Sequence, residues 1–361
     1  MAIVINGSGT VTGLAVGGLP DGTVDEGTLA TDSVTAAKIP ASLENTFVSG
    51  RKNLLINGGF DVWQRGTTGT AQGYNSADRW YISRGGGSPA VSITRETFAT
   101  TETDIKSKYY LQWVQSTGGT TPYIAQRVEE IKPLLGQEVT VSVWMKAASA
   151  VTIDLDVYID YGDAQSTTLD ENTSFSVTTS WQKFQHTFTI SSGGTVSANS
   201  NLEVRFSPPD SNTITTYFAE AQLELGSTAT DFEHRSYGEE LALCQRYFCK
   251  SFRISTTPAN DTTEDNGGWG GLTAYSSATA RNAPFTYPIR MRAVPTIVFY
   301  NGSPDEGNGL WGYYTGSNWA DSTATSTGRV TENHFFASVQ GSYTSKYSYL
   351  GRGHWTADAE L

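Results

Sequence analysis

The 361-residue chain has few charged side chains, and its basic residues are fewer than its acidic ones. Only 17% of its residues are charged, with 24 Lys and Arg against 36 Asp and Glu. A nucleic-acid partner needs clustered Lys and Arg that neutralise phosphates, and this sequence has no such cluster. The same acidic balance disfavours adhesion to an anionic membrane surface. We therefore expect neither nucleic acid nor membrane lipid as a partner.

Long apolar runs and a basic leader are also lacking. The opening residues, MAIVINGSG, contain no basic stretch followed by an apolar one, and no segment approaches about 18 consecutive apolar residues. We expect a protein that is made in the cytoplasm, does not insert into a membrane and is not exported by a signal peptide.

Cysteine and histidine are scarce, with two and four residues. Cys244 and Cys249 lie five apart in a segment predicted to be helical, where they point to different faces, so we expect free thiols. The histidines show no metal-ligand spacing. Asp154 and Asp156 share one face of a predicted strand, but a solvated acidic pair is expected there rather than a glycosidase pair. Without a nucleophile elbow or phosphate-binding loop, the sequence predicts no enzyme and no required cofactor.

Small residues dominate the first fifty positions, and an aliphatic residue recurs there at every fifth position. The recurring residues are Leu14, Leu19, Val24, Leu29, Val34 and Ile39. One chain alone would leave them in water, whereas several chains wound about a common axis would bury them. We interpret residues 1–50 as an attachment stalk of a homo-oligomer; the alternative is a disordered linker with accidental spacing.

Alternating strands follow the stalk. Val139 to Met145 and Val151 to Ile159 place apolar residues at every second position, as half-buried strands do. Further strands are expected over 183–190, 202–206 and 217–225, and near 285–300, 330–349 and 355–361. One helix is predicted from Tyr237 to Cys249. The fold class is all-β: a stalk (1–50), a central jelly-roll β-sandwich (51–237), and a linking helix with a C-terminal β domain (238–361).

Several segments carry a resemblance to a known family. They are Asn53 to Asp61 with Trp63 and Gln64, Ala77 to Trp80, Val139 to Lys146, Thr179 to Trp181, Ala221 to Ser227 with Phe232 and Glu233, Gly238 to Phe248, Met291 to Thr296, and Ala357 to Leu361. Over residues 53–250, and more weakly to 361, the chain resembles the jelly-roll domain of tailed-phage and prophage tail-fibre proteins. That domain is itself similar to carbohydrate-binding modules.

The resemblance implies a virion tail component that attaches to the host surface. The implied partners are other copies of the chain in a trimer, other tail proteins through residues 1–50, and a host glycan bound many times over. The alternatives are a structural spacer that binds only tail proteins and, further off, a polysaccharide depolymerase.

Sugar binding requires aromatic rings and planar polar groups that point away from the core. Five candidates lie on the outward positions of their predicted strands, and a sixth, Trp181, sits at the entrance of a strand; the outward five are Trp144, Tyr158, Asp154, Asp156 and Arg205. The alternative for Trp144 is that a neighbouring sheet, loop or subunit covers it. Trp63 and Trp80 are expected in the core. A calcium site is implied by the resemblance alone, at Asp61 and Glu220, although Ala219 stands where a second acid is usual.

A second aromatic segment lies at 307–328 among Gly, Asn, Ser and Thr. Its rings are Trp311, Tyr313, Tyr314 and Trp319. Rigid rings on a polar backbone are typical of binding loops, so this segment is predicted to contact a receptor; the alternative is packing in a subunit interface.

Overall fold

The computed structural model describes residues 51–86, 90–99, 104–162, 167–210, 213–260, 269–282, 284–303, 307, 309–344 and 347–361, with the short paired strands β1 (Val4–Ile5) and β2 (Val11–Thr12). Two compact units are present, Met1–Arg51 and Lys52–Leu361. The five-residue repeat lies outside the described residues, so the stalk and the trimer stay predictions.

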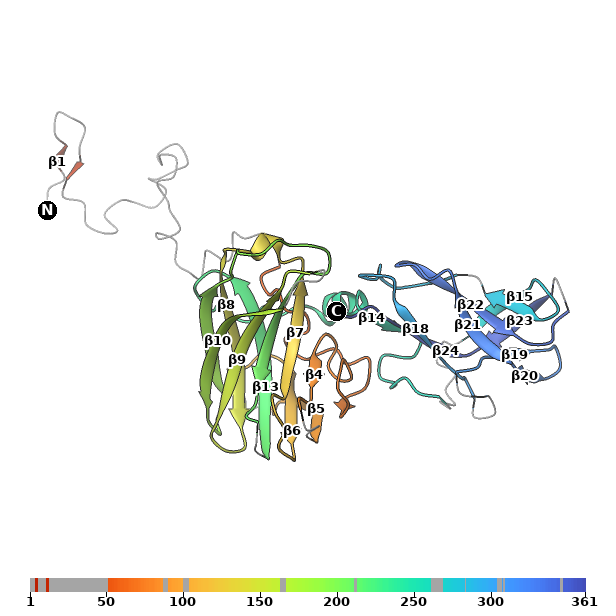
Figure 1. The fold of residues 1–361 in the computed structure, drawn as a ribbon, viewed down its shortest axis with the longest axis horizontal. Helices are drawn as coiled ribbons and strands as arrows, with labels where there is room; N and C mark the ends of the chain where they lie inside the picture. The colour runs from red at the N-terminus through yellow and green to blue at the C-terminus, as the bar shows by residue number, and fades with distance from the viewer. Residues whose placement is uncertain are drawn as a thin grey trace. The chain divides into compact units, whose positions relative to one another are not determined.

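The first part of the second unit is a sandwich of two antiparallel sheets (Figure 1). In spatial order, the five-stranded sheet contains β10 (Thr168–Val177), β9 (Val151–Asp160), β12 (Asn201–Ser207), β7 (Tyr123–Glu129) and β4 (Tyr81–Ser83). The six-stranded sheet contains β11 (Gln182–Thr189), β8 (Glu138–Ala147), β13 (Ile214–Leu225), β6 (Tyr109–Gln115), β5 (Val91–Thr97) and β3 (Thr68–Gly69). A single 3₁₀ turn, η2 (Lys132–Leu134), joins β7 to β8.

Alternation along the strands builds the core between these sheets. In β9, Ile153, Leu155 and Val157 are fully buried, whereas the residues between them are half-exposed. Trp80 and Trp63 are buried as predicted. The inward rows of both sheets thus form one apolar layer, and the outward rows form two separate surfaces.

The linking helix is shorter than the sequence suggested. Helix α2 (Tyr237–Gln245) begins at a capping box in which Ser236 and Glu239 bond reciprocally. It ends before Phe248 because β14 (Phe248–Lys250) pairs with β24 (His354–Asp358), and this pairing overrides the helical pattern. Both cysteines are free, as expected, and both are buried. None of the described helices has the length and apolar composition of a membrane span.

The C-terminal β region has its own core and two sheets. The smaller sheet contains β14, β24 and β18 (Thr296–Tyr300). The larger contains β17 (Phe285–Thr286), β22 (His334–Gln340), β16 (Thr279–Asn282), β15 (Trp269–Ala274), β23 (Ser348–Arg352), β19 (Gly312–Tyr314), β20 (Trp319–Asp321) and β21 (Ala324–Gly328), which pairs with β22. Leu272, Trp311 and Phe335 are fully buried in this second core.

Charged side chains join the sandwich to the residues after β24. Arg79, whose side chain is 1% exposed, pairs with Glu360. Its guanidinium lies 3.4 Å from the centroid of the Tyr247 ring and donates to the Arg127 carbonyl oxygen at 2.8 Å. Burial by itself would lower the pKa of Arg79, but Glu360 raises it above the ordinary value. The domain boundary at 237 stays a prediction, and these contacts bridge it.

Replacement of Glu360 by Gln tests this junction. The substitution leaves the Arg79 cation buried without its carboxylate, so we expect a loss of about 3 kcal/mol in the free energy of unfolding, measured by urea titration. Glu138→Gln at the exposed start of β8 is the matched control. A Glu360→Gln variant no less stable than this control would contradict the structural role of the pair.

Candidate functional site

The outward face of the five-stranded sheet collects polar and aromatic side chains in register. Tyr81 and Arg205 both pair across strands with Ala125, and Arg205 pairs in turn with Asp156. Asp156 pairs with Asn172 at the far side. One row of outward residues therefore crosses all five strands. We call this surface the five-stranded face.

Aromatic rings and a guanidinium make a continuous band on the five-stranded face. The ring centroids of Tyr74 and Tyr81 are 5.3 Å apart, and those of Tyr81 and Tyr123 are 6.3 Å apart. The Arg205 guanidinium carbon lies 4.4 Å from the Tyr123 ring and 3.8 Å from the Tyr158 ring. Because a cation over a ring is attracted to its π electrons, Arg205 holds both rings in place.

Glu203 fixes the orientation of the arginines in this band. Its carboxylate accepts from Arg127 Nε at 2.6 Å and also pairs with Arg205. Burial raises the pKa of Tyr123, so its hydroxyl stays protonated. Of the N–H groups of Arg205, only the one on Nε has a hydrogen-bond acceptor among the described residues. The remaining N–H groups of this guanidinium are therefore available to a ligand.

The two aspartates lie beside the band and are held by neighbouring side chains. Asp156 accepts from Asn172 Nδ2 at 2.5 Å and from Ser207 Oγ at 3.0 Å. Asp154 accepts from Ser174 Oγ at 2.6 Å. Each carboxylate thus belongs to its own hydrogen-bonded set. Their arrangement suits acceptance of hydroxyl groups from a ligand.

The six predicted sugar-contacting residues fall on two opposite surfaces. Tyr158, Asp154, Asp156 and Arg205 lie together on the five-stranded face. Trp144 lies in β8 and Trp181 directly before β11, both on the six-stranded sheet. Since the core separates these sheets, no single glycan residue contacts both groups.

Part of the predicted receptor segment lies in the second core. Trp311 is 0% and Tyr313 4% exposed. The Trp311 ring packs against Phe285 and Phe299, and its Nε1 donates to the His354 carbonyl oxygen at 3.2 Å. The prediction that these two rings contact a receptor therefore needs correction, because the hairpin turns them inward.

The other two rings of that segment stay half-exposed. The centroids of Tyr314 and Trp319 are 5.5 Å apart, and Arg352 lies 4.4 Å from the Trp319 ring.

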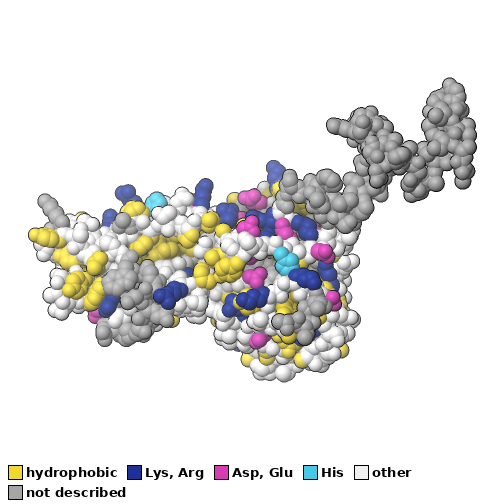
Figure 2. Space-filling view, turned by 180° about the vertical axis from the view of Figure 1, so that it is seen from behind, with side chains coloured by type: hydrophobic (Ala, Val, Ile, Leu, Met, Phe, Trp, Pro, Cys, Tyr) yellow, Lys and Arg dark blue, Asp and Glu magenta, His cyan; other side chains and the backbone are white. Residues whose placement is uncertain are grey.

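On the side seen in Figure 2, apolar side chains gather over the C-terminal β region, whereas charged side chains of both signs gather over the sandwich.

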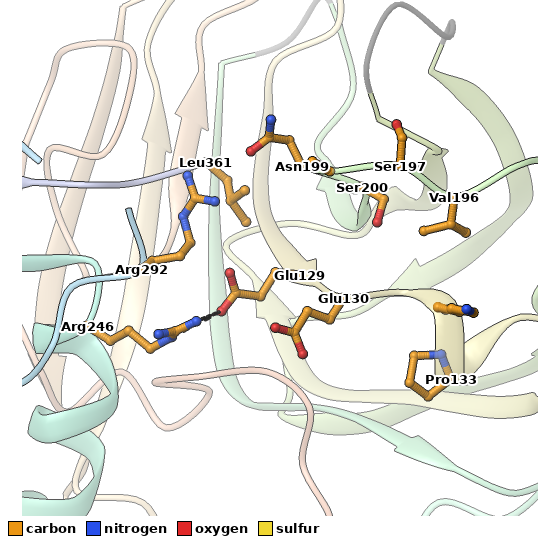
Figure 3. A pocket seen from close by; sticks show the side chains of 12 residues that line it. Glu129, Glu130, Pro133, Val196, Ser197, Asn199, Ser200, Arg246, Arg292 and Leu361 are labelled. Carbon is orange, nitrogen blue, oxygen red and sulfur yellow. Dashed lines mark hydrogen bonds and ion pairs between the residues drawn. The ribbon is translucent and has the colours of Figure 1, made fainter. Parts of the chain in front are cut away.

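A hollow of about 500 Å³ lies where the end of β7 faces the segment after α2 (Figure 3). Glu129 points toward Arg246, whose Nη2 donates to it at 2.8 Å, and also accepts from the Tyr247 hydroxyl at 2.9 Å. This carboxylate is committed to holding α2 against the sandwich. The hollow serves the junction and is not our candidate site.

The residues present do not fit a calcium site. Glu220 Oε1 accepts from the backbone N–H groups of Lys106 at 2.7 Å and Ser107 at 2.8 Å, so this oxygen faces donors. Across the described ranges, no three His, Cys, Asp or Glu side chains gather as metal ligands. Calcium takes six to eight oxygens, and Asp61 with Glu220 falls short of such a set. We derive no role for the ion.

Four residues of the band on the five-stranded face were absent from the sequence prediction: Tyr74, Tyr81, Tyr123 and Arg127. Alternation would have found two of them, because Ile124 and Val128 mark the inward row of β7 and leave Tyr123 and Arg127 outward. Tyr81 belongs to a three-residue strand, which is too short for a periodic signal. Tyr74 lies outside the regular strands, where no alternation exists.

Comparison with known proteins agrees with this architecture. Residues 52–212 match the CBM4/9 family model, described as a carbohydrate binding domain. The chain thus carries a CBM4/9-like carbohydrate-binding jelly-roll domain. No curated protein gave a significant match.

Several solved structures are similar to part of this chain, and three of them are described below. A CBM4 structure is 18% identical, with a TM-score of 0.34, over 47% of this chain and 98% of that one. The CBM22-1 xylan-binding domain from Paenibacillus barcinonensis is 21% identical, with a TM-score of 0.31, over 50% of this chain and 100% of that one. The enzymatically active domain of tailspike protein 4 from bacteriophage CBA120 is 12% identical, with a TM-score of 0.32, over 48% of this chain and 21% of that one.

The carboxyl group of Asp61 provides a pH prediction. Burial, with help from Glu240, raises its pKa from 3.8 to about 6, against the opposing effect of His234, Lys108 and Arg95. The folded state therefore binds more protons than the unfolded state between about pH 4 and pH 6, and this group lowers stability as pH rises through that window. With a chelator present, we expect Asp61→Asn to unfold at a higher temperature than the parent at about pH 7, and at the parent's temperature near pH 4.

The same melting curves test the calcium result. If added calcium raises the unfolding temperature of the parent but not that of Asp61→Asn, then Asp61 holds the ion and our conclusion is wrong. An Asp61→Asn variant that is destabilised at both pH values would contradict the effect of burial.

Proposed function

We propose that this chain is a tail-fibre component that attaches a virion to glycans of the bacterial host surface. The family match supports carbohydrate binding by the sandwich. The sequence resemblance and the stalk-like repeat of residues 1–50 support the place in a tail fibre. The chain would act as a homotrimer, anchored to other tail proteins through that stalk, and without an enzymatic step.

The observation that carries the proposal is the arginine between two tyrosines on the five-stranded face. Arg205, which is 19% exposed, offers N–H donors beside the rings of Tyr123 and Tyr158. Pyranose rings present apolar C–H faces to aromatic rings and hydroxyl groups to planar donors and acceptors. Asp154 and Asp156 supply acceptors on the neighbouring strand. Five strands spaced by about 4.8 Å make the row longer than a single sugar, so an oligosaccharide fits it best.

Repetition would convert a weak contact into firm attachment. Each sandwich exposes its band to solvent, where competition from water keeps single-site affinity low. Three copies on one fibre make the later binding events intramolecular and raise the overall avidity. This requirement links the glycan-binding face to the oligomer predicted from the stalk.

Substitution of Tyr158 tests this face. We expect Tyr158→Ala to weaken binding to host cells or purified host polysaccharide by roughly 1 to 3 kcal/mol per site, as for other stacked rings. Tyr158→Phe keeps the ring and the cation contact and should retain most of the binding. Tyr275→Ala, at a tyrosine 56% exposed in the C-terminal β region, is the matched control.

Binding is measured by glycan array and cell pull-down with variants whose unfolding temperature equals the parent's. If Tyr158→Ala binds as well as Tyr275→Ala, the five-stranded face is not the glycan site. If the parent itself binds no host glycan and no host cell, the structural spacer becomes the better account. Release of reducing sugar from host envelope would instead indicate a depolymerase.

A further inference from the structure

A second aromatic surface lies on the opposite side of the sandwich, on the outward face of the six-stranded sheet. It consists of Phe98, Tyr110, Trp181 and Tyr217, which we call the Trp181 cluster. The centroid of Trp181 lies 5.2 Å from that of Phe98, 5.5 Å from that of Tyr110 and 6.3 Å from that of Tyr217. All four side chains are half-buried, so the rings support one another and still meet solvent.

Lys146 of β8 extends its ammonium over this cluster. Its Nζ lies 5.0 Å from the Trp181 centroid and 4.9 Å from the Tyr217 centroid. Both rings lie within the distance at which a cation is attracted to the face of an aromatic ring. In the part of the chain that the structure describes, this ammonium has no carboxylate and no hydrogen-bond acceptor within reach. The cation is therefore positioned by the rings while its three donors stay available.

A hollow of about 360 Å³ opens beside Lys146. Its lining includes Trp144 and Trp181 together with the polar residues Asp104, Thr179 and Ser180. Trp144 makes no ring contact or side-chain hydrogen bond with any described residue, and Asp104 forms no ion pair with one. This volume is at the lower end of the roughly 300–1,000 Å³ of small-molecule sites, so it suits one sugar residue.

We propose that this hollow binds a pyranose bearing a carboxylate, a uronic acid residue of an acidic polysaccharide. The sugar ring packs on Trp144 and Trp181, and the carboxylate takes the ammonium of Lys146. A charge-assisted hydrogen bond is about twice as strong as a neutral one, so the cation favours the acid over the corresponding neutral sugar. Asp104, which also lines the hollow, accepts hydroxyl groups and repels a carboxylate, so it favours the orientation in which the acid meets Lys146.

This site is independent of the one on the five-stranded face. Trp144 and Lys146 lie in β8, whereas Tyr158 lies in β9 of the other sheet, and the apolar core separates them. One domain would therefore hold two segments of polysaccharide on opposite surfaces. The two sites are separable by mutation, so failure of one leaves the other standing.

The experiment is a titration of the full chain with the methyl glycosides of glucuronate and galacturonate and with their neutral parents. Binding is followed by NMR of the indole N–H signals, with the signal of Trp144 assigned from the Trp144→Phe variant. We expect at least one uronide to shift the Trp144 signal and to bind about tenfold more tightly than its neutral parent. Lys146→Met should abolish this preference.

Two control variants sharpen the result. Lys132→Met makes the same substitution at η2, outside the hollow, and Tyr158→Ala changes the opposite face; both should keep the preference for the uronide. The proposal is overturned if neither uronide shifts the Trp144 signal, if neutral sugars bind equally well, or if Lys146→Met binds uronides as the parent does. Lys146 is half-exposed, and near-parental melting of Lys146→Met shows that the fold is intact.

Discussion

Burial of every second residue along the long strands is the constraint from which the rest of the sandwich follows. The period of two sends Val157 and Ile159 inward while Tyr158 points to solvent. Two sheets packed in this way share one apolar layer and expose two surfaces that cannot cooperate on one ligand residue. The five-stranded face and the Trp181 cluster are these two surfaces, and each combines rings with a cation.

The same alternation explains how much of the fold the sequence predicted. The long strands β8, β9, β11, β12 and β13 were expected within a few residues of their actual ends, because half-buried strands carry a strong periodic signal. The helix was extended too far because the pairing of Phe248 with Asp358 joins residues 110 positions apart. A local pattern contains no information about such a partner.

For the candidate site, parity along each strand was predictable but sheet membership was not. Tyr158 and Trp144 both have outward parity, yet which sheet receives each strand depends on non-local hydrogen bonds. The prediction that Trp311 contacts a receptor was wrong for another reason. An aromatic residue in a segment of Gly, Asn and Ser is typical of a binding loop, but here a hairpin buries the ring against Phe285 and Phe299. The composition of a segment shows that it contains aromatic rings, but it does not tell whether those rings are exposed to solvent or buried in a core.

The central claim is that the five-stranded face is where this chain holds its glycan. The most direct measurement is a crystal structure of the chain with an oligosaccharide that it binds. We expect the sugar rings to lie along the band of Tyr81, Tyr123 and Tyr158, with hydroxyl groups bonded to Arg205 and Asp156. A bound oligosaccharide found on the sheets of the C-terminal β region, with the five-stranded face empty, would contradict the account.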